Sequence, residues 1–263
     1  MKCRITREVS GSMISNPVID SLMSRKSIRK YREEQPSDEV IETIVRAGQQ
    51  APFAMQLGSV LLSREIEHNV FRAPLLFTIC VDVYRMEKIM KKRGWNRKAS
   101  DIYTLLFGIQ DAAYMAQNMV VAAESLGLGS CYIGAAPFMT KKIRELYELP
   151  DRIFPLVMMT MGYPAEAPPV RPRYPMDFHL SESRYTCYTD DTVSEAAEVM
   201  DSGYLRQNYY REANYMIPLP EGTEEKFDFD SYSWTEHISR KLGLWGEDPE
   251  ELLSNLKLCG FEI

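Results

Sequence analysis

The sequence predicts an α+β fold in which helices alternate with a few apolar strands. Two segments support this prediction most directly. Residues 74–83 form a continuous apolar and β-rich run, which is typical of a central strand covered on both faces. Residues 100–126 carry apolar side chains around much of a helical circumference, which predicts a long helix that is buried nearly all round.

The first half of the chain is expected to contain two further helices and one further strand. Residues 18–23 have the apolar spacing of a buried helix. Ser37 is a good N-cap for the next helix, whose apolar stripe ends before Pro52. A strand is expected at residues 59–63, and the polar residues 85–100 predict a surface helix and loop.

The second half is expected to alternate in the same way and then to become helical. The predicted elements are, in order, a strand at residues 131–135, a helix at 140–147, a strand at 153–161, an aromatic-rich helix at 192–215, an acidic loop at 218–230, and two closing helices at 233–243 and 249–258. The character of the sequence changes after residue 185, beyond which we find no chemical motif.

The length of the helix predicted at residues 100–126 bears on how the protein assembles. At ~1.5 Å per residue it extends over about 40 Å, and one chain of 263 residues rarely surrounds so long a helix. Its apolar pattern is compatible with a subunit interface and equally with a central core helix.

The composition is that of an acidic globular protein. The 263 residues are 45% hydrophobic and 26% charged, with a formal net charge of −6 and a pI of about 5.3. Such a body repels nucleic acid and anionic membranes, so we expect neither as a partner. Basic clusters are therefore expected to act as local sites.

The spacing of the cysteines and the sequence of the N-terminal residues predict the cellular compartment in which the protein functions. The five cysteines are scattered and form no Cys-x-x-Cys pair, which argues against a disulfide framework and favours a reducing cytoplasm. Residues 1–12 lack the apolar stretch of a signal peptide, and because Met13 precedes the first predicted helix we expect them to be either a disordered extension or the product of an upstream start. The histidines, at 68, 179 and 237, lack the spacing of metal ligands, so no metal site is expected.

A dense basic run follows the first predicted helix directly. Residues 25–31 contain four cations and the hydroxyl of Ser27. A guanidinium offers a rigid fork of donors that suits phosphate or carbonyl oxygens, and a hydroxyl can donate to a further oxygen. The alternative is a solvated helix end, where cations cap carbonyls and favour the helix dipole.

Three later segments complement this run. In residues 127–134 the long helix ends on glycine and an apolar strand begins. Residues 161–173 form a stiff, proline-rich loop that contains two arginines. Residues 179–185 contain a histidine and an arginine. In this order and at these separations, the four segments resemble the FMN-dependent nitroreductase family. The resemblance covers roughly residues 16–185.

The resemblance implies a fold, an assembly and a cofactor. Residues 13–185 would form a nitroreductase-like three-layer α/β/α domain around a central mixed, largely antiparallel sheet. Residues 186–263 would be a helical C-terminal extension that packs on the core or on a partner subunit. The family's arrangement implies a homodimer with FMN at the subunit interface.

The resemblance also implies which residues bind the cofactor, through its phosphate, its ribityl oxygens and the pyrimidine edge of its ring. The expected cofactor-binding residues are Arg25, Lys26, Ser27, Arg29, Pro52, Phe53, Ala54, Gln56, Ile133, Gly134, Arg171 and Arg173. Gly134 is expected to act in catalysis through its backbone N–H, which would stabilise negative charge at the reactive edge of the flavin. No side-chain acid or base is predicted.

One segment departs from the family pattern. Family members often carry an asparagine and a Gln-Pro-Trp run after the Ala-Pro that ends the early helix, whereas here Pro52 precedes Phe53, Ala54, Met55 and Gln56. Only Gln56 remains as an amide partner for the ring, so a more apolar pocket floor is expected. Core packing explains Phe53 and Met55 equally well.

The activity implied by the resemblance is the reduction of a small-molecule electron acceptor. NADH or NADPH would reduce FMN and leave, and a nitroaromatic, quinone or related electrophile would then accept two electrons in a ping-pong reaction. The alternatives are a flavin reductase or ene-reductase on the same site, and a non-catalytic flavin-binding protein for storage or sensing.

Overall fold

The structure of the protein, a computed structural model, describes residues 14–244 and 249–263. The described residues form two compact units. We call residues 15–168 together with 249–263 the sheet unit, and residue 14 together with 169–244 the helical unit.

These units differ from the division expected from the sequence. The boundary expected after residue 185 lies inside the helical unit, and the last helix of the chain belongs to the sheet unit. The extension expected at residues 1–12 lies outside the described residues.

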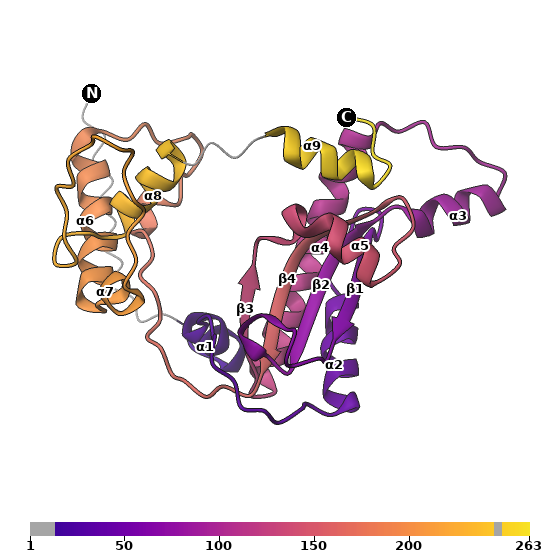
Figure 1. Ribbon diagram of the computed structural model, residues 1–263, viewed down its shortest axis with the longest axis horizontal. Coiled ribbons are helices and arrows are strands. Elements are labelled where there is room, and N and C mark those ends of the chain that lie inside the picture. The colour runs from indigo at the N-terminus through magenta and orange to yellow at the C-terminus, as the bar shows by residue number, and fades with distance from the viewer. Residues whose placement is uncertain (1–13, 245–248) are drawn as a thin grey trace. The chain divides into compact units, whose positions relative to one another are not determined.

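Within the described residues, four strands form one antiparallel sheet in the order β1-β2-β4-β3 (Figure 1). The strands are β1 (Gly58–Ser63), β2 (Leu75–Asp82), β3 (Gly129–Ile133) and β4 (Ile153–Gly162). The α+β class is confirmed, and so is the central strand, because β2 lies between two neighbours and is almost entirely buried. A parallel pairing occurs at the isolated bridge between Ser27 and Ser130.

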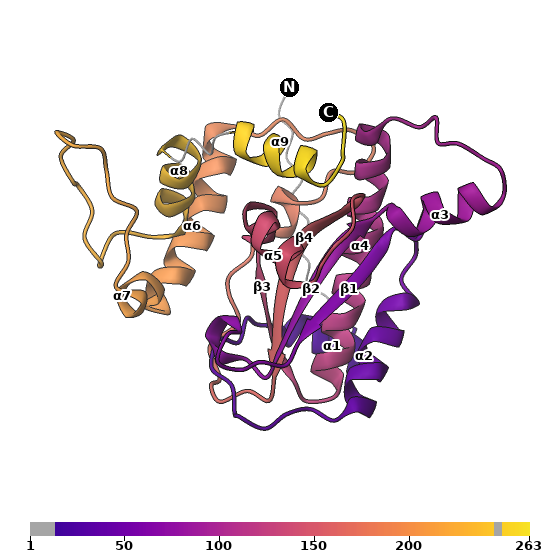
Figure 2. The ribbon, with the colours of Figure 1, turned by 45° about the vertical axis from the view of Figure 1, so that its right-hand side comes forward.

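Helices cover both faces of the sheet, which confirms the three-layer arrangement. On one face, α2 (Asp38–Gln49) and α4 (Asp101–Ser125) pack together against β1 and β2 (Figure 2). On the other face, α5 (Thr140–Leu146) packs against β4, and α9 (Pro249–Leu258) lies beside α5. Alternate residues of β2 divide between these layers, as the period of two in a strand requires.

The other helices expected in the sheet unit are present. They are α1 (Pro17–Ser24) and the surface helix α3 (Tyr84–Lys92). Ser37 accepts a hydrogen bond from the backbone N–H of Val40 and caps α2, as expected.

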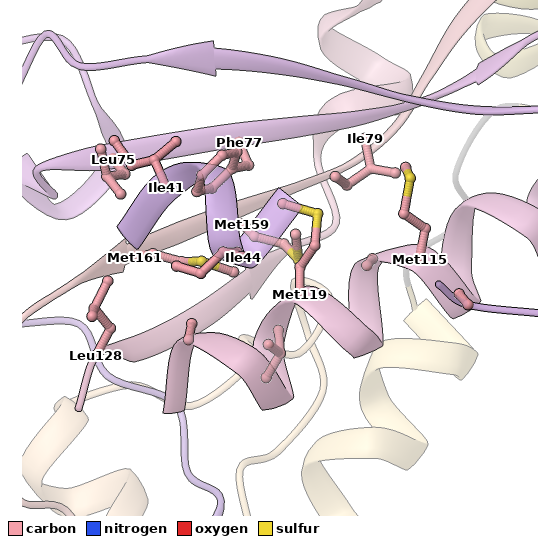
Figure 3. Packing of buried hydrophobic residues seen from close by; sticks show 14 of the residues in the cluster. Ile41, Ile44, Leu75, Phe77, Ile79, Met115, Met119, Leu128, Met159 and Met161 are labelled. Atoms are coloured by element: carbon pink, nitrogen blue, oxygen red, sulfur yellow. The ribbon is translucent and has the colours of Figure 1, made fainter. Parts of the chain in front are cut away.

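The largest core cluster joins α2 and α4 to the sheet and is rich in methionine (Figure 3). Phe77 of β2, Met119 of α4 and Met159 of β4 are fully buried in it. Gly48 allows α2 to approach α4 closely, because a Cβ there would lie 2.6 Å from Cγ of Met119. The unbranched thioether side chains fill the space between helices and sheet, which holds α4 against the strands.

Burial of α4 is one-sided. Ala116 and Met119 are buried in the core, whereas Ile102 and Leu106 expose 63% and 55% of their surface. No side chain of α1 is buried against the rest of the described chain either. Within one chain α4 is therefore not buried nearly all round, because the sheet covers only one side of it, and the burial expected for α1 is not found because α1 packs mainly against α4. Apolar outer faces remain on α1 and α4.

A buried ion-pair cluster ties the C-terminal segment to the start of α4. Arg152 donates to Asp101 at 2.6 Å and to Glu87 at 3.0 Å. It also donates to the carbonyl of Gly260 at 2.6 Å, and its guanidinium carbon lies 4.4 Å from the centre of the Phe261 ring. Burial alone would raise the pKa of Asp101, but hydrogen bonds from Arg152 and a backbone N–H hold that pKa below its ordinary value.

The helical unit contains α6 (Asp190–Arg206), α7 (Tyr209–Ala213) and α8 (Trp234–Leu244). A single helix was expected over most of α6 and α7, but Asn208 adopts a left-handed conformation with φ of 50° and separates them. Arg240 of α8 is buried and donates to both carboxylate oxygens of Glu225 at 2.7 Å, which lowers the pKa of Glu225 to about 2. None of the described helices is long and apolar enough to cross a membrane.

Candidate functional site

The basic run is held against the start of β3. Ser27 forms a bridge with Ser130, and the backbone N–H of Ile28 donates to the Ser130 carbonyl at 2.9 Å. Ile28 packs so closely over Gly129 that a Cβ on that glycine would lie 2.4 Å from Cγ1 of Ile28. The structure therefore brings the basic run and the glycine-rich segment together, far apart as they are in the sequence.

The other side of the basic run is held by the loop that follows β4. The Glu166 carboxylate accepts hydrogen bonds from the backbone N–H groups of Arg29 at 2.5 Å and Lys30 at 3.1 Å. The Tyr31 hydroxyl lies 2.8 Å from the Thr160 hydroxyl, within hydrogen-bond distance. Two of the four segments singled out in the sequence, together with residues 161–168 of a third, thus meet in the sheet unit. The sequence analysis missed Glu166, whose only signal was an acidic residue in a proline-rich loop.

The side chains of the basic run differ in exposure. Arg25, Lys26 and Ser27 are half-buried, whereas Arg29 is exposed. The Nε atom of Arg25 is buried and has no hydrogen-bond partner among the described residues. Because buried donors are nearly always paired, this atom has the capacity to bind an oxygen from outside the chain.

Gly134 lies directly after β3 and is exposed. No described atom lies within 4 Å of the position that a Cβ would take, and its φ is not in the left-handed region. Neither packing nor backbone conformation therefore requires glycine here. Both observations are compatible with the role expected from the sequence, in which glycine at position 134 allows a ligand to approach the backbone closely.

A second group of expected residues forms an exposed turn between α2 and β1. Pro52, Phe53, Ala54 and Gln56 are all exposed there, and Gln56 has a φ of 57°. The turn is shaped by Asp111 of α4, which is only 4% exposed.

Asp111 holds the turn through backbone hydrogen bonds. Its carboxylate accepts from the N–H groups of Ala54 at 2.6 Å, Met55 at 3.0 Å and Leu57 at 3.0 Å. The sequence analysis missed this residue. Its signal was a carboxylate on the buried side of an otherwise apolar helix.

A pocket of about 130 Å³ opens beside this turn. It is lined by Gly48, Gln49, Ala51, Pro52, Phe53, Gln56, Gly58, Arg85, Asp111 and Met115. Pockets that bury most of a drug-sized ligand have volumes of about 300–1,000 Å³, so this one does not enclose a tricyclic ring by itself.

The two groups of expected residues lie along different parts of α4. The turn is held at Asp111, whereas Arg25 lies next to Glu124 near the C-terminal end of the helix. At ~1.5 Å per residue these two positions are about 20 Å apart along the helix axis. Within one sheet unit, the basic run and the turn are therefore separate surfaces.

Arg171 and Arg173 belong to the helical unit. Arg171 donates to the side-chain oxygen of Gln207 at 2.6 Å, and its guanidinium carbon lies 4.1 Å from the centre of the Tyr209 ring. Arg173 donates to the Arg171 carbonyl at 3.0 Å. Convergence of these two arginines with the basic run stays a prediction.

The sequence is similar to known proteins over a region that contains most of these segments. A family model described as the nitroreductase family matches residues 22–63 and 62–163. An FMN reductase (NADPH) from Bacillus subtilis is 31% identical over 192 residues, which cover 67% of this chain and 77% of the relative. An oxygen-insensitive NADPH nitroreductase from Salmonella typhimurium is 27% identical over 241 residues, which cover 86% and 91%.

Solved structures show the same similarity. An NADPH:FMN oxidoreductase from Vibrio harveyi, solved in complex with NAD+, matches with a TM-score of 0.73 and 25% identity, covering 94% of this chain and 99% of that one. NfrA2 of B. megaterium has a TM-score of 0.80 at 23% identity, covering 95% and 99%, which supports the fold alone. Because the family match extends over more than half of the chain and contains the basic run, β3 and β4, this chain belongs to the nitroreductase family.

Proposed function

We propose that the protein is an FMN-dependent oxidoreductase that uses NADPH or NADH to reduce small electrophilic acceptors such as nitroaromatics and quinones. The relatives named as an NADPH-dependent FMN reductase and an NADPH nitroreductase support the cofactor, the electron donor and the reaction class. Bound FMN supplies a ring that takes two electrons from the nicotinamide and passes them to a second substrate, in a ping-pong sequence. The chain itself binds that ring, orients it and stabilises charge on it.

The observation that carries this proposal is the buried, unpartnered Nε of Arg25 on a segment held from both sides. A buried guanidinium donor without an acceptor among the described residues suits the phosphate or carbonyl oxygens of a flavin. Lys26 and Ser27 lie half-buried on the same segment and offer further donors. The fixed backbone positions these donors in advance, so little conformational entropy is lost on binding.

Gly134 is assigned to the reacting edge of the ring. Its backbone N–H would donate to the negative charge that develops there, and its missing side chain leaves room for the ligand. No side chain of the chain is assigned as acid or base. Arg171 and Arg173 are proposed as further phosphate-binding residues.

A homodimer completes the site in this proposal. The basic run and the turn at Pro52 are about 20 Å apart along α4, and the pocket at the turn is small, so the turn of a second subunit would cover the flavin. The exposed apolar faces of α1 and α4 offer the surface for that second subunit. We place the enzyme in the cytoplasm, with a small-molecule acceptor as its other partner.

Purified protein tests the function directly. We expect the purified protein to be yellow from bound flavin. The visible flavin absorbance should be lost when NADPH is added in the absence of oxygen, and it should return when a nitroaromatic or a quinone is added. Protein that stays yellow with both nicotinamides would support storage or sensing. Protein that neither contains nor binds FMN would contradict the proposal, and preference for free flavin as acceptor would favour the FMN reductase alternative.

Charge on the outer face of α4 should split the dimer. In Leu106→Asp, an apolar side chain that is 55% exposed in one chain becomes a carboxylate in the interface. Loss of apolar burial and desolvation of the charge should weaken association by about 2 kcal/mol or more, at least ~30-fold in the dissociation constant. Sedimentation equilibrium measures this constant.

Leu146→Asp is the matched control, because Leu146 is also an exposed leucine, on α5. It should leave the dimer intact. A wild-type protein that is monomeric at all concentrations, or a Leu106→Asp variant as dimeric as the wild type, would contradict the assigned interface.

A further inference from the structure

A carboxylate lies beside the guanidinium that the proposed function assigns to the flavin. The side chain of Glu124, near the end of α4, is 15% exposed, and that of Arg25 is 22% exposed. Glu124 Oε1 lies 3.9 Å from Arg25 Nε, which is too far for a hydrogen bond. The two groups attract each other, yet the buried donor of Arg25 stays unused.

The groups that face Glu124 come from α1 and β3. Arg25 follows the end of α1, and Ser130 and Tyr132 belong to β3. The Ser130 hydroxyl is fully buried without a well-aligned hydrogen bond, but it lies close enough to Glu124 to favour the charged carboxylate. The Tyr132 ring centre lies 5.8 Å from the guanidinium carbon of Arg25.

Burial raises the pKa values of two groups in this cluster, Glu124 and Tyr132. Burial raises the pKa of Glu124, although Arg25 and Ser130 both act to lower it. Burial also raises the pKa of Tyr132 to about 12, so this hydroxyl stays neutral at physiological pH. Among these groups, Glu124 is the one whose charge changes as the pH falls from neutral.

A bound anion changes the balance around Arg25. It places a second negative charge beside the same guanidinium, next to a carboxylate that is already disfavoured by burial. Two like charges at one site disfavour each other, and the carboxylate can lose its charge by binding a proton. Binding of the anion and protonation of Glu124 are therefore linked.

We propose that Glu124 competes with the anionic group of the flavin for Arg25, and that flavin binding is accompanied by proton uptake on Glu124. This inference rests on the proposed FMN function. In the free protein the carboxylate attracts the guanidinium, and in the complex the guanidinium pairs with the ligand. The proton comes from solvent and remains on the carboxyl group, so Glu124 is a positioning residue whose charge limits affinity.

Two parts of the cofactor could pair with Arg25. One is the phosphate, which is an anion, and the other is the carbonyl edge of the pyrimidine ring, whose oxygens carry only partial negative charge. Riboflavin has the ring without the phosphate and so distinguishes them. If the effect of Glu124 disappears with riboflavin, the phosphate pairs with Arg25, whereas an effect that persists assigns the pyrimidine edge.

The variant Glu124→Gln keeps the shape of the side chain and removes its charge. Its dissociation constant for FMN, measured by quenching of flavin fluorescence, should be about tenfold lower than that of the wild type at pH 8. The ratio should fall towards one as the pH is lowered from 8, because burial raises the pKa of Glu124 and the wild-type carboxylate then loses the charge that the variant lacks. The phosphate of FMN also titrates, with a second pKa of about 6. This titration changes FMN binding to the wild type and to the variant equally, so it cancels in the ratio of their dissociation constants.

Glu145→Gln is the matched control, because it removes the same charge from an exposed position on α5. It should leave the FMN dissociation constant unchanged at every pH. A Glu124→Gln variant that binds FMN more weakly than the wild type, or with a ratio independent of pH, would overturn the competition while leaving the FMN function standing. A wild type that binds no FMN would overturn both.

Calorimetry of the wild type gives a second test that needs no variant. FMN binding, measured at several pH values between about 6 and 8 in two buffers of different ionisation enthalpy, should show net proton uptake that declines towards pH 8, where Glu124 keeps its charge in the free protein and in the complex. Proton release, or no proton exchange, would contradict the proposal even if Glu124→Gln did not fold.

Discussion

Replacing Arg152 with alanine is expected to lower the free energy of unfolding of the sheet unit by about 3–5 kcal/mol. Arg152 lies between Asp101 and Glu87, at 2.6 and 3.0 Å, and Asp101 is only 3% exposed. Alanine leaves that carboxylate buried with only Arg97, at 2.8 Å, and the backbone N–H of Glu262, at 2.7 Å, to compensate it, and removal of one partner of a buried ion pair is strongly destabilising. The change also removes the hydrogen bond to Gly260 and frees the C-terminal segment. Urea unfolding followed by circular dichroism measures the effect.

Arg46→Ala is the matched control. Arg46 donates to Glu42 at 2.8 Å, and the two side chains are 74% and 62% exposed, so its loss should lower the free energy of unfolding by about 1 kcal/mol or less. Equal effects of the two substitutions would show that the cluster around Arg152 is no more important than a surface pair.

The same comparison should depend on pH in one direction. The pKa of Asp101 is held below its ordinary value, so its contribution is fully present above the unfolded value of about 3.9. That contribution is lost as the pH falls through the folded-state pKa. The difference between wild type and Arg152→Ala should therefore be constant near neutrality and shrink below about pH 4.

The double variant Arg25→Ala/Arg29→Ala is expected to lose FMN while remaining folded. A hydrogen bond that involves a charged group contributes about 1.5–3 kcal/mol, so loss of two should weaken FMN binding by at least about a hundredfold. Folding should change little, because Arg29 is exposed and Arg25 forms no hydrogen bond with the nearest described carboxylate, Glu124, which lies 3.9 Å away and can bind a proton when the guanidinium is removed. Flavin retained through gel filtration, together with the melting temperature, measures both outcomes.

Lys141→Ala/Lys142→Ala removes the same two positive charges from exposed positions on α5 and serves as the control. It should retain FMN. If both double variants bind FMN like the wild type, the basic run is a solvated helix end, which is the alternative that its sequence left open.

Local patterns were enough to predict most elements of the sheet unit. The apolar run at residues 74–83 became β2, and Ser37 became the N-cap of α2, because side-chain periodicity and capping act over a few residues. The break at Asn208 was not predicted, since asparagine in a left-handed conformation is compatible with many contexts.

Burial was harder to predict than secondary structure. The apolar residues of α4 predicted burial nearly all round, but the pattern does not say whether the chain or a second copy covers each face. The structure buries Ala116 and leaves Leu106 exposed, which confines the candidate interface to the outer side of the helix. The C-terminal helix was likewise expected in an extension, whereas its contacts with α5, together with those of Arg152 with Gly260 and Phe261, join this segment to the sheet unit.

The sequence by itself determined the family, the order of the elements and the chemistry of the basic run, because these depend on residue types and short spacings. Only the tertiary structure decided how the run is held. Glu166 reaches back to the backbone of Arg29 from 137 residues away, Ser130 accepts from Ile28, and Glu124 lies against Arg25. Such contacts depend on which elements pack together in the folded chain. The interactions of a buried charge are stronger there because the interior has a lower dielectric constant than water.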